Sequence, residues 1–400
     1  MKTSYLVLLA ILFSLPGSAM SGNENADEFL WLEEVEGARA LSFAKEQNEK
    51  TLAVMKSDPI YPSLEADIRQ IMLAKDRLPA VTLKAGKLYN FWQDSTHVRG
   101  IWRRATIEGY KTLNPTWETV LDLDALATAE NENWVWKGAD CLAPAEELCM
   151  LRLSRGGKDA SVIREFDLTT KAFVAGGFTL PEAKGGISWI DSDTLYVSTD
   201  FGDGSLTDSG YPRIVKLWKR GEALSAATEV YRGAKIDMSA GSWVYDNGEE
   251  RYRFVYRRPT FYSGEYFWHV DSGELIPVPI PNDANLVGVF KGRVVYSLRT
   301  ELKSAAKNFA AGSLLALPMS EVRKGAAAVP ELLFAPTKKR FLSEVSLTKN
   351  TILIDVLDNV KGKILRVTPS GEGKWKSEIL PFGGNGMASV MSTEVSSDLF

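Results

Sequence analysis

The segment from residue 200 to residue 213, "DFGDGSLTDSGYPR", is the densest group of potential ligand-binding side chains in the sequence. The candidates are Asp200, Asp203, Ser205, Asp208, Ser209 and Arg213. An EF-hand would need oxygen ligands at positions one, three and five and a glutamate at twelve, and a phosphate loop would need a lysine followed by a helix. Neither pattern is present, so we expect no metal and no cofactor here. We predict a long loop between two strands, which helps to bind a ligand or to control access to one.

Histidine is scarce, which limits the chemistry that the chain could perform. Only His97 and His269 occur, and no Gly-x-Ser-x-Gly nucleophile motif is present. A serine nucleophile needs a base within hydrogen-bonding reach. We therefore assign no catalytic residue, and we interpret His97 as a turn residue and His269 as a packing residue.

Acidic residues suggest a different catalytic class, the hydrolysis of a glycan by paired carboxylates. Asp191, Asp193 and Asp200 are the candidates. This hypothesis requires two carboxylates roughly 5–10 Å apart in one cavity.

The N-terminus is typical of an export signal. "MKTSYLVLLAILFSLPGSAM" combines an early lysine, a short apolar run and small residues before a predicted cleavage between Ala19 and Met20. The apolar run is short for a membrane anchor. We expect a periplasmic or secreted protein that leaves the membrane once the signal is removed. In such a compartment Cys141 and Cys149, the only two cysteines, are candidates for a disulfide that staples a hairpin; two unpaired thiols are the alternative.

Charge and composition exclude one class of partner. The net charge is -4 and the isoelectric point is about 5.6, which excludes a strongly basic nucleic-acid binder. The residues are 45% apolar, enough to bury a sizeable core.

The pattern of apolar residues divides the chain into three regions: a signal peptide at 1–19, a helical segment at 20–78 and a strand-rich region at 79–400. Two helices are predicted in the second region, where Leu64, Ile68, Ile71 and Met72 share one helical face. In the third region, groups of strands begin near Val81, Trp134, Ile187, Ser242, Leu286, Leu342 and Ala388. Their spacing of roughly 45–55 residues is typical of four-stranded propeller blades. We predict a mainly β fold, a seven-bladed propeller whose seventh blade is incomplete; a pair of β-sandwiches is the alternative.

Several motifs resemble those of prolyl oligopeptidase-type serine peptidases and occur in that family's order. The segment "DEFLWLEEVEGARALSFAKEQNEKT" resembles the family's N-terminal segment, with Asp27, Trp31 and Gln47-Asn48 at matching places. "HVRGIWRR", "WETVLDLDAL", "NWVWKGA" and "SGYPRIVKLWKRG" are similar to the propeller of a bacterial branch. The resemblance extends over residues 27–400.

The resemblance implies a propeller that caps an α/β-hydrolase domain and admits only short peptides. It also implies that the N-terminal helices pack on the hydrolase domain and that the catalytic serine, aspartate and histidine follow the propeller. The sequence departs from the pattern because it ends before that domain would begin. We therefore expect a chain that is inactive alone, either a fragment or a true short form, and whose partner is a hydrolase domain in cis or an unknown protein. A stand-alone periplasmic propeller that binds peptides or a protein is the alternative function.

Overall fold

The computed structural model describes residues 27–34, 36–74, 76–112, 114–304, 307–371, 373–382 and 386–400. The predicted signal peptide and its cleavage point between Ala19 and Met20 lie outside these residues. The chain divides into two compact units, one ending at Ala74 and one running from Lys75 to Phe400.

The first unit is helical, as the sequence predicts. It holds the short 3-10 helix η1 (Leu30–Glu33) and the helices α1 (Ala38–Lys56) and α2 (Tyr61–Met72). Pro62 lies in the first turn of α2, where its missing N–H costs no intrahelical hydrogen bond. The predicted apolar face of α2 is exposed, since Leu64, Ile68, Ile71 and Met72 show about half or more of their surface.

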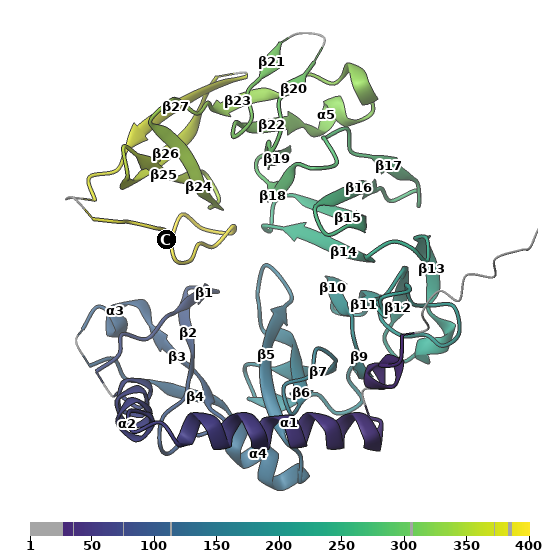
Figure 1. The fold of residues 1–400 in the computed structure, drawn as a ribbon. Helices are drawn as coiled ribbons and strands as arrows, with labels where there is room; N and C mark the ends of the chain where they lie inside the picture. Colours follow the sequence, from purple (N-terminus) through teal and green to yellow (C-terminus); the bar gives the residue numbers. More distant parts are fainter. Residues whose placement is uncertain are drawn as a thin grey trace, which may run out of the picture. The chain divides into compact units, whose positions relative to one another are not determined.

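Among the described residues, the second unit holds five four-stranded antiparallel sheets, one five-stranded antiparallel sheet and a separate two-stranded hairpin (Figure 1). The first sheet holds β1 (Thr82–Lys84), β2 (Lys87–Trp92), β3 (Ile101–Thr106) and β4 (Glu118–Asp122). The second holds β5 (Trp134–Cys141), β6 (Leu148–Arg155), β7 (Ser161–Asp167), β8 (Ala172–Phe173) and β9 (Thr179–Ala183), the last two pairing with different parts of β7. The third holds β10 (Gly186–Asp191), β11 (Thr194–Ser198), β12 (Ile214–Lys219) and β13 (Thr228–Arg232).

The remaining sheets follow the same order. The fourth holds β14 (Ser239–Asp246), β15 (Arg251–Thr260), β16 (Ser263–His269) and β17 (Leu275–Pro277). The fifth holds β18 (Asn285–Val289), β19 (Arg293–Ser297), β22 (Leu314–Pro318) and β23 (Glu331–Phe334), with a small hairpin of β20 (Leu302–Lys303) and β21 (Asn308–Phe309) inserted. The sixth holds β24 (Arg340–Leu347), β25 (Ile352–Asp358), β26 (Lys361–Gly371) and β27 (Lys374–Ile379). These six sheets begin within a few residues of the predicted starts.

Helices in the second unit are short. They are α3 (Ile107–Tyr110), α4 (Leu123–Glu130), α5 (Met319–Val322) and the 3-10 turns η2 (Leu224–Ala226) and η3 (Gly325–Ala327). Asp122 caps α4 by accepting a hydrogen bond from the amide of Ala125. No helix among the described residues is long and apolar enough to cross a bilayer.

The core lies between neighbouring sheets. Met150 and Ile163 of the second sheet pack with Trp189 and Leu195 of the third, and similar clusters join the other neighbours. The second to fifth sheets, which have a neighbour on each side, therefore pack both of their faces against other sheets. This explains why a strand such as β22 is wholly apolar and does not alternate between apolar and polar residues.

Because successive strands run in opposite directions, the loops sort onto two faces of the unit. The loop between the second and third strands of each sheet lies on the same face as the connection to the next sheet. A hydrogen bond from Asp208 N to Lys235 O joins two such segments directly, and Gly264 N, at the start of β16, donates to Asn282 O in the connection before β18. We call this the connection face. The segment before β1 enters the unit here, since Asn90 Nδ2 donates to Ala80 O.

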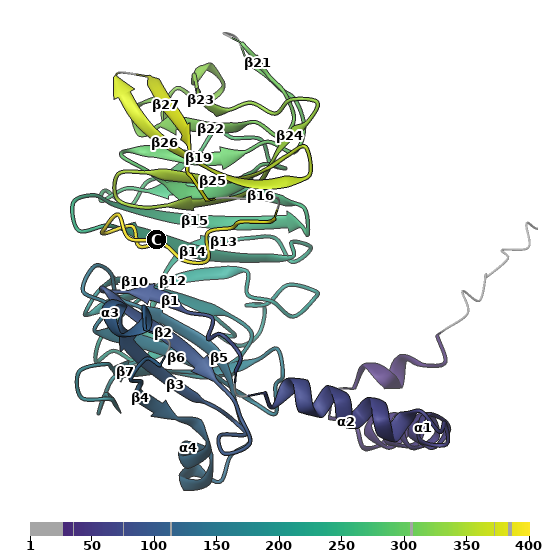
Figure 2. The same ribbon diagram turned by 90° about the vertical axis from the view of Figure 1, so that its left-hand side faces the viewer.

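The C-terminal tail, residues 386–400, lies between the sixth and the first sheets, where the seventh sheet was expected (Figures 1 and 2). It contains no strand. Ser392 Oγ accepts from the amide of Leu83 at 2.9 Å, while the amide of Val390 donates to Asp355 Oδ2 at 2.9 Å. The tail thus bridges the two ends of the row of sheets, and the incomplete seventh blade is represented by this segment without a strand.

Candidate functional site

The predicted loop between β11 and β12 forms and is held by its own polar side chains. The Ser205 hydroxyl lies 3.0 Å from Asp200 Oδ1 and 2.6 Å from Gly202 O, and it accepts from the amide of Phe201. Arg213 donates to the carbonyl oxygens of Gly204 and Gly233. These three predicted site residues therefore shape the loop and do not point to a ligand.

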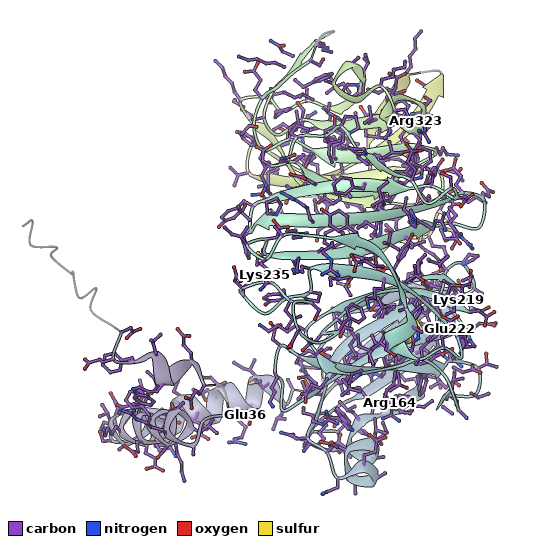
Figure 3. The ribbon with its side chains drawn as sticks, turned by 90° about the vertical axis from the view of Figure 1, so that its right-hand side faces the viewer. Glu36, Arg164, Lys219, Glu222, Lys235 and Arg323 are labelled. Carbon is purple, nitrogen blue, oxygen red and sulfur yellow. A yellow bond between two sulfur atoms is a disulfide. The ribbon has the colours of Figure 1, made fainter. Side chains whose placement is uncertain are left out.

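The other predicted residues of the loop have different surroundings. Asp203 and Asp208 are exposed, and Ser209 contacts the Thr207 hydroxyl at 3.2 Å. The amide of Asp208 donates to the carbonyl of Lys235, which lies in the connection between β13 and β14 and is labelled in Figure 3. The described residues bring no three His, Cys, Asp or Glu side chains close enough to hold a metal ion.

A polar cavity of about 500 Å³ lies beside this loop, between the second, third and fourth sheets. Tyr211 and Pro212 of the loop line it, and the Tyr211 hydroxyl donates to Asp159 Oδ2 at 2.7 Å. The strands β5, β10 and β14, each at one edge of its sheet, supply most of the remaining wall. Reasoning from the sequence placed the site in the loop but missed this cavity.

Charged residues from three segments meet in this polar cavity. They are Lys137, Asp140, Arg152, Asp159 and Lys184. Hydrogen bonding from Tyr211 lowers the pKa of Asp159, and Lys184 and Lys137 lower it further. Burial raises the pKa of Asp140, against the opposing effect of Arg152 and Lys84. The walls thus carry both signs of charge.

Part of this polar lining lacks a protein partner. The Ser198 hydroxyl is buried and has no hydrogen-bond partner among the described residues. Arg152 Nε lies 3.2 Å from Asp140 Oδ2, within ion-pair distance, but it makes no hydrogen bond of good geometry. Buried polar atoms normally find a partner, so these two atoms mark places where a ligand or water would be favourable.

Small residues allow close packing in the wall of the polar cavity. The motifs "GGISW" at 185–189 and "SAGSW" at 239–243 begin two neighbouring edge strands. Gly185 has φ +152°, and a Cβ there would overlap the carbonyl oxygen of Ser198; a Cβ on Gly241 would come 2.5 Å from the Tyr256 hydroxyl. Ser188 and Ser242 join the two strands through their hydroxyls at 3.0 Å. The repeated small-residue motif is the sequence signal from which the cavity could have been found.

A smaller cavity of about 280 Å³ shares Asp140 and Ile187 with the polar cavity and extends toward the opposite face. Cys141 lines it, and the structure joins Cys141 to Cys149 in a disulfide between directly opposed residues of β5 and β6. The disulfide lies next to the hairpin turn between β5 and β6.

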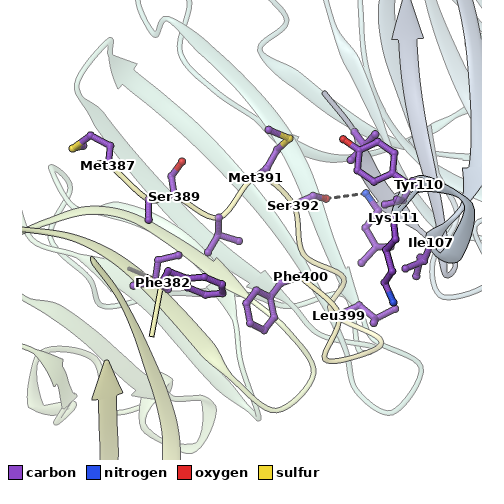
Figure 4. Close-up of a pocket in the computed structure, with 16 residues that line it drawn as sticks. Ile107, Tyr110, Lys111, Phe382, Met387, Ser389, Met391, Ser392, Leu399 and Phe400 are labelled. Atoms are coloured by element: carbon purple, nitrogen blue, oxygen red, sulfur yellow. Dashed lines mark hydrogen bonds between the residues drawn. The ribbon is translucent and has the colours of Figure 1, made fainter. Parts of the chain in front are cut away.

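A third hollow, of about 650 Å³, is apolar and lies along the tail (Figure 4). Phe382, Met391 and Phe400 line it from the C-terminal side, and Ile107 and Tyr110 line it from α3, the short helix between β3 and β4. It belongs to the junction between the first and sixth sheets, so we treat it as structural.

The glycan hypothesis is wrong on geometry. Asp191 and Asp193 share the turn before β11, where Asp193 pairs with Arg220, whereas Asp200 follows β11. A strand of five residues spans about 17 Å, which separates Asp200 from the other two by more than a carboxylate pair allows. The two earlier aspartates lie in a turn and line none of the cavities described above.

The two histidines have structural surroundings. His97 closes a turn with Asp94, whose pKa is lowered to about 2 chiefly by the hydrogen bond from the His97 amide. His269 is buried and its Nδ1 contacts the Tyr196 hydroxyl. Neither residue lines the polar cavity.

Comparison with known proteins places this geometry in a family. The family model for the N-terminal β-propeller domain of prolyl oligopeptidase matches residues 17–400. A protein of Sinorhizobium fredii named an uncharacterized peptidase is 36% identical over 387 residues, covering 94% of this chain and 53% of that protein. A similarly named protein of Rickettsia prowazekii is 28% identical, with coverages of 94% and 54%.

Solved structures agree on the fold. A post-proline cleaving enzyme from Rickettsia typhi matches with a TM-score of 0.81 and 29% identity, covering 88% of this chain and 53% of that one. A prolyl endopeptidase structure matches with a TM-score of 0.68 at 14% identity, a level that supports the fold alone. The chain spans about half the length of the relatives that it matches. The mainly β propeller fold predicted from the sequence is confirmed, and the chain belongs to the prolyl oligopeptidase family as its N-terminal β-propeller domain.

Proposed function

We propose that this propeller belongs to an exported serine peptidase and restricts the access of short peptides to an α/β-hydrolase domain in the same polypeptide. One observation carries the proposal. The loop from Asp200 to Arg213, the mouth of the polar cavity and the segment that enters β1 share the connection face. A hydrolase domain attached close to the segment before β1 would therefore contact the loop and the mouth of the polar cavity.

The helical unit supports the same proposal. The apolar side chains of α2 are exposed, and so are Leu52, Val54 and Met55 at the end of α1. Exposed apolar faces of this kind mark interaction surfaces. We propose that they pack on the hydrolase domain.

The decisive experiment shortens the loop in the longest natural form of the protein. Residues 202–210 are replaced by Asn-Gly, and the turnover of a short and a long proline-containing peptide is compared with that of the unaltered protein. We expect the ratio of long to short substrate turnover to rise, because a shorter loop obstructs the connection face less. Unchanged turnover of both peptides would rule out gating by this loop.

The length of the native protein decides between this proposal and the binding-module alternative. The intact mass of the protein captured from its source is compared with the 44.2 kDa of this chain. A much larger mass supports a peptidase with a hydrolase domain. A mass near that of this chain without its signal peptide supports a stand-alone binding module. The polar cavity, which is formed wholly by this chain, would then be the binding site.

Export is tested on the same sample. N-terminal sequencing should begin at Met20, and the protein should be found outside the cytoplasm. Alkylation before reduction should leave Cys141 and Cys149 unmodified. An intact N-terminus in a cytoplasmic fraction with reactive thiols would contradict export.

A further inference from the structure

The polar cavity beside the loop carries one positive charge in excess. Three cationic side chains, Lys137, Arg152 and Lys184, face two carboxylates, Asp140 and Asp159. Arg152 is paired with Asp140 at 3.2 Å. The excess charge therefore lies on the two lysines, which share a single carboxylate, Asp159.

The contacts of the lysines leave them able to accept an anion. Lys184 Nζ is 3.6 Å from Asp159 Oδ2 and 4.3 Å from the centre of the Tyr211 ring. Lys137 Nζ donates to the carbonyl of Gly157 at 3.3 Å, near the limit for a hydrogen bond. An ammonium group has three donors, so each lysine retains donors for a ligand.

The size of the charge excess selects the kind of anion. A single excess charge matches a monoanionic carboxylate, whereas a phosphate dianion would leave a net negative charge close to Asp140 and Asp159. The buried hydroxyl of Ser198, which has no partner, offers a further hydrogen bond in the same cavity.

The backbone of the walls selects the rest of the ligand. β5, β10 and β14 are edge strands, so each has N–H and C=O groups that its own sheet does not pair. In β14 two backbone groups bond to other segments, since the amide of Ala240 donates to Pro212 O and Ser242 O accepts from the Ser188 hydroxyl. Extended peptides bind such edges through their main chain. A cavity of about 500 Å³ lies within the usual range for small-molecule sites.

We propose that the polar cavity is a binding site for the carboxylate of a peptide, with Lys137 and Lys184 as its cationic partners. The choice of a peptide rests on the proposed function, while the choice of a carboxylate rests on the cavity alone. The carboxylate is either the C-terminus or an acidic side chain of the peptide.

The experiment is isothermal titration calorimetry on the 400-residue chain with three acetylated tripeptides. Ala-Pro-Ala with a free C-terminus tests the terminal carboxylate, Ala-Pro-Glu amide tests the side-chain carboxylate, and Ala-Pro-Ala amide is the neutral reference. We expect at least one acid to bind about tenfold more tightly than the neutral peptide, and we expect salt to weaken that binding. Equal affinity for all three would overturn the proposal.

Two changes in the cavity that should alter the affinity for the acidic peptide in opposite directions locate the site. Lys137→Met combined with Lys184→Met should weaken binding of the acid by about tenfold. Asp159→Asn should strengthen it by about threefold, because the lysines lose a competing carboxylate while Tyr211 keeps an acceptor. A purely structural role for these residues would not produce opposite changes.

Lys219→Met is the matched control, since Lys219 is an exposed lysine on β12 and does not line the cavity (Figure 3). It should leave the affinity unchanged, and thermal unfolding of every variant should match that of the unaltered chain. Asp159→Asn keeps the proposal falsifiable if the double lysine variant fails to fold. Loss of acid binding in Lys219→Met, or no change in either cavity variant, would overturn the proposal.

This result is independent of the gating experiment. Binding to the 400-residue chain involves no turnover. If acidic peptides bind more tightly than the neutral one but loop shortening leaves turnover unchanged, gating is refuted and the carboxylate site is supported. If loop shortening alters turnover but all three peptides bind equally, gating is supported and the carboxylate site is refuted.

Discussion

At the scale of single residues, an ion pair between a buried carboxylate and a half-buried arginine links the second and third sheets. Glu165 has a side chain only 1% exposed, and Arg220 donates to both of its carboxylate oxygens at 2.9 Å. Glu165 also accepts from the amide of Phe178. Removing the cation would leave a buried carboxylate without its main compensation.

We therefore predict that Arg220→Ala lowers the free energy of unfolding by about 3 kcal/mol. Arg323→Ala is the control, because Arg323 and Glu274 are both more than half exposed at the surface (Figure 3). That variant should cost less than about 1 kcal/mol. Urea unfolding measures both values, and equal losses would contradict the assignment.

Another residue-scale feature responds to pH. Burial, reinforced by Arg253 and opposed by Asp271, lowers the pKa of His269 below 6.5. Burial also raises the pKa of Tyr196 to about 12, so the Tyr196 hydroxyl stays protonated beside Nδ1 of His269.

The sign of the effect on stability follows from these directions. As the pH falls below about 6.5, the unfolded chain binds a proton at His269 that the folded chain does not, so the free energy of unfolding decreases. The loss is about 1.4 kcal/mol for each unit of pKa depression and ends once the pH passes the folded-state pKa. His269→Asn should flatten this dependence in urea titrations between pH 5 and 8. A variant with the same slope as the unaltered chain would contradict the prediction.

At the scale of elements, the loop between β11 and β12 depends on one hydroxyl. Ser205 is 2% exposed, and its loss would free the amide of Phe201 and the carboxylate of Asp200. We predict that Ser205→Ala costs about 1–2 kcal/mol and speeds hydrogen exchange across residues 200–213. Asp203→Ala, in the same loop but exposed, should change neither quantity. Similar exchange in the two variants would show that the hydroxyl does not hold the loop.

The elements themselves could be predicted well because their signals are local. Alternating apolar residues and turn residues located β5 at Trp134, and the helical spacing of apolar residues located α2. The loop after β11 was also correctly placed. The roles of the residues within the loop were not predicted. An aspartate such as Asp200 can either bind a ligand or stabilise its own loop, and only the fold shows that Asp200 accepts a hydrogen bond from Ser205.

The polar cavity could not be predicted for a different physical reason. Its walls come from segments around Lys137, Lys184 and Gly241, which are brought together only by the packing of three sheets. The signal for an opening is the absence of side chains, and glycine or serine at a strand start is ordinarily taken as a turn residue. The charged residues of the cavity indicate a binding site only when the fold has placed these segments next to one another.

At the scale of the whole β-sheet unit, the tail joins the first and sixth sheets. Asp398 accepts from the Thr348 hydroxyl and from the amide and side chain of Asn350, while Val395 packs against two core clusters. We predict that deleting residues 386–400 lowers the free energy of unfolding by about 2–4 kcal/mol through lost apolar burial and hydrogen bonds.

Thermal unfolding and binding of an apolar dye measure this effect. The deletion should lower the melting temperature and raise dye binding, because Leu83, Leu88 and Ile364 line the hollow beside the tail. Asp398→Ala is the milder comparison and should lower the melting temperature without raising dye binding. An unchanged melting temperature after the deletion would show that the junction is held without the tail.

The tail also affects how the unit folds over time. The hydrogen bond between Leu83 and Ser392 joins residues 309 positions apart, far beyond the separation of paired strands within any sheet. Closing so long a loop in a disordered chain carries a large entropic cost, which falls once the intervening sheets have formed. The sheets can form from local hairpins, so we expect the junction between the tail and the first sheet to be the last part of the unit to form. Its formation should then limit the rate at which the first and sixth sheets become joined through the tail.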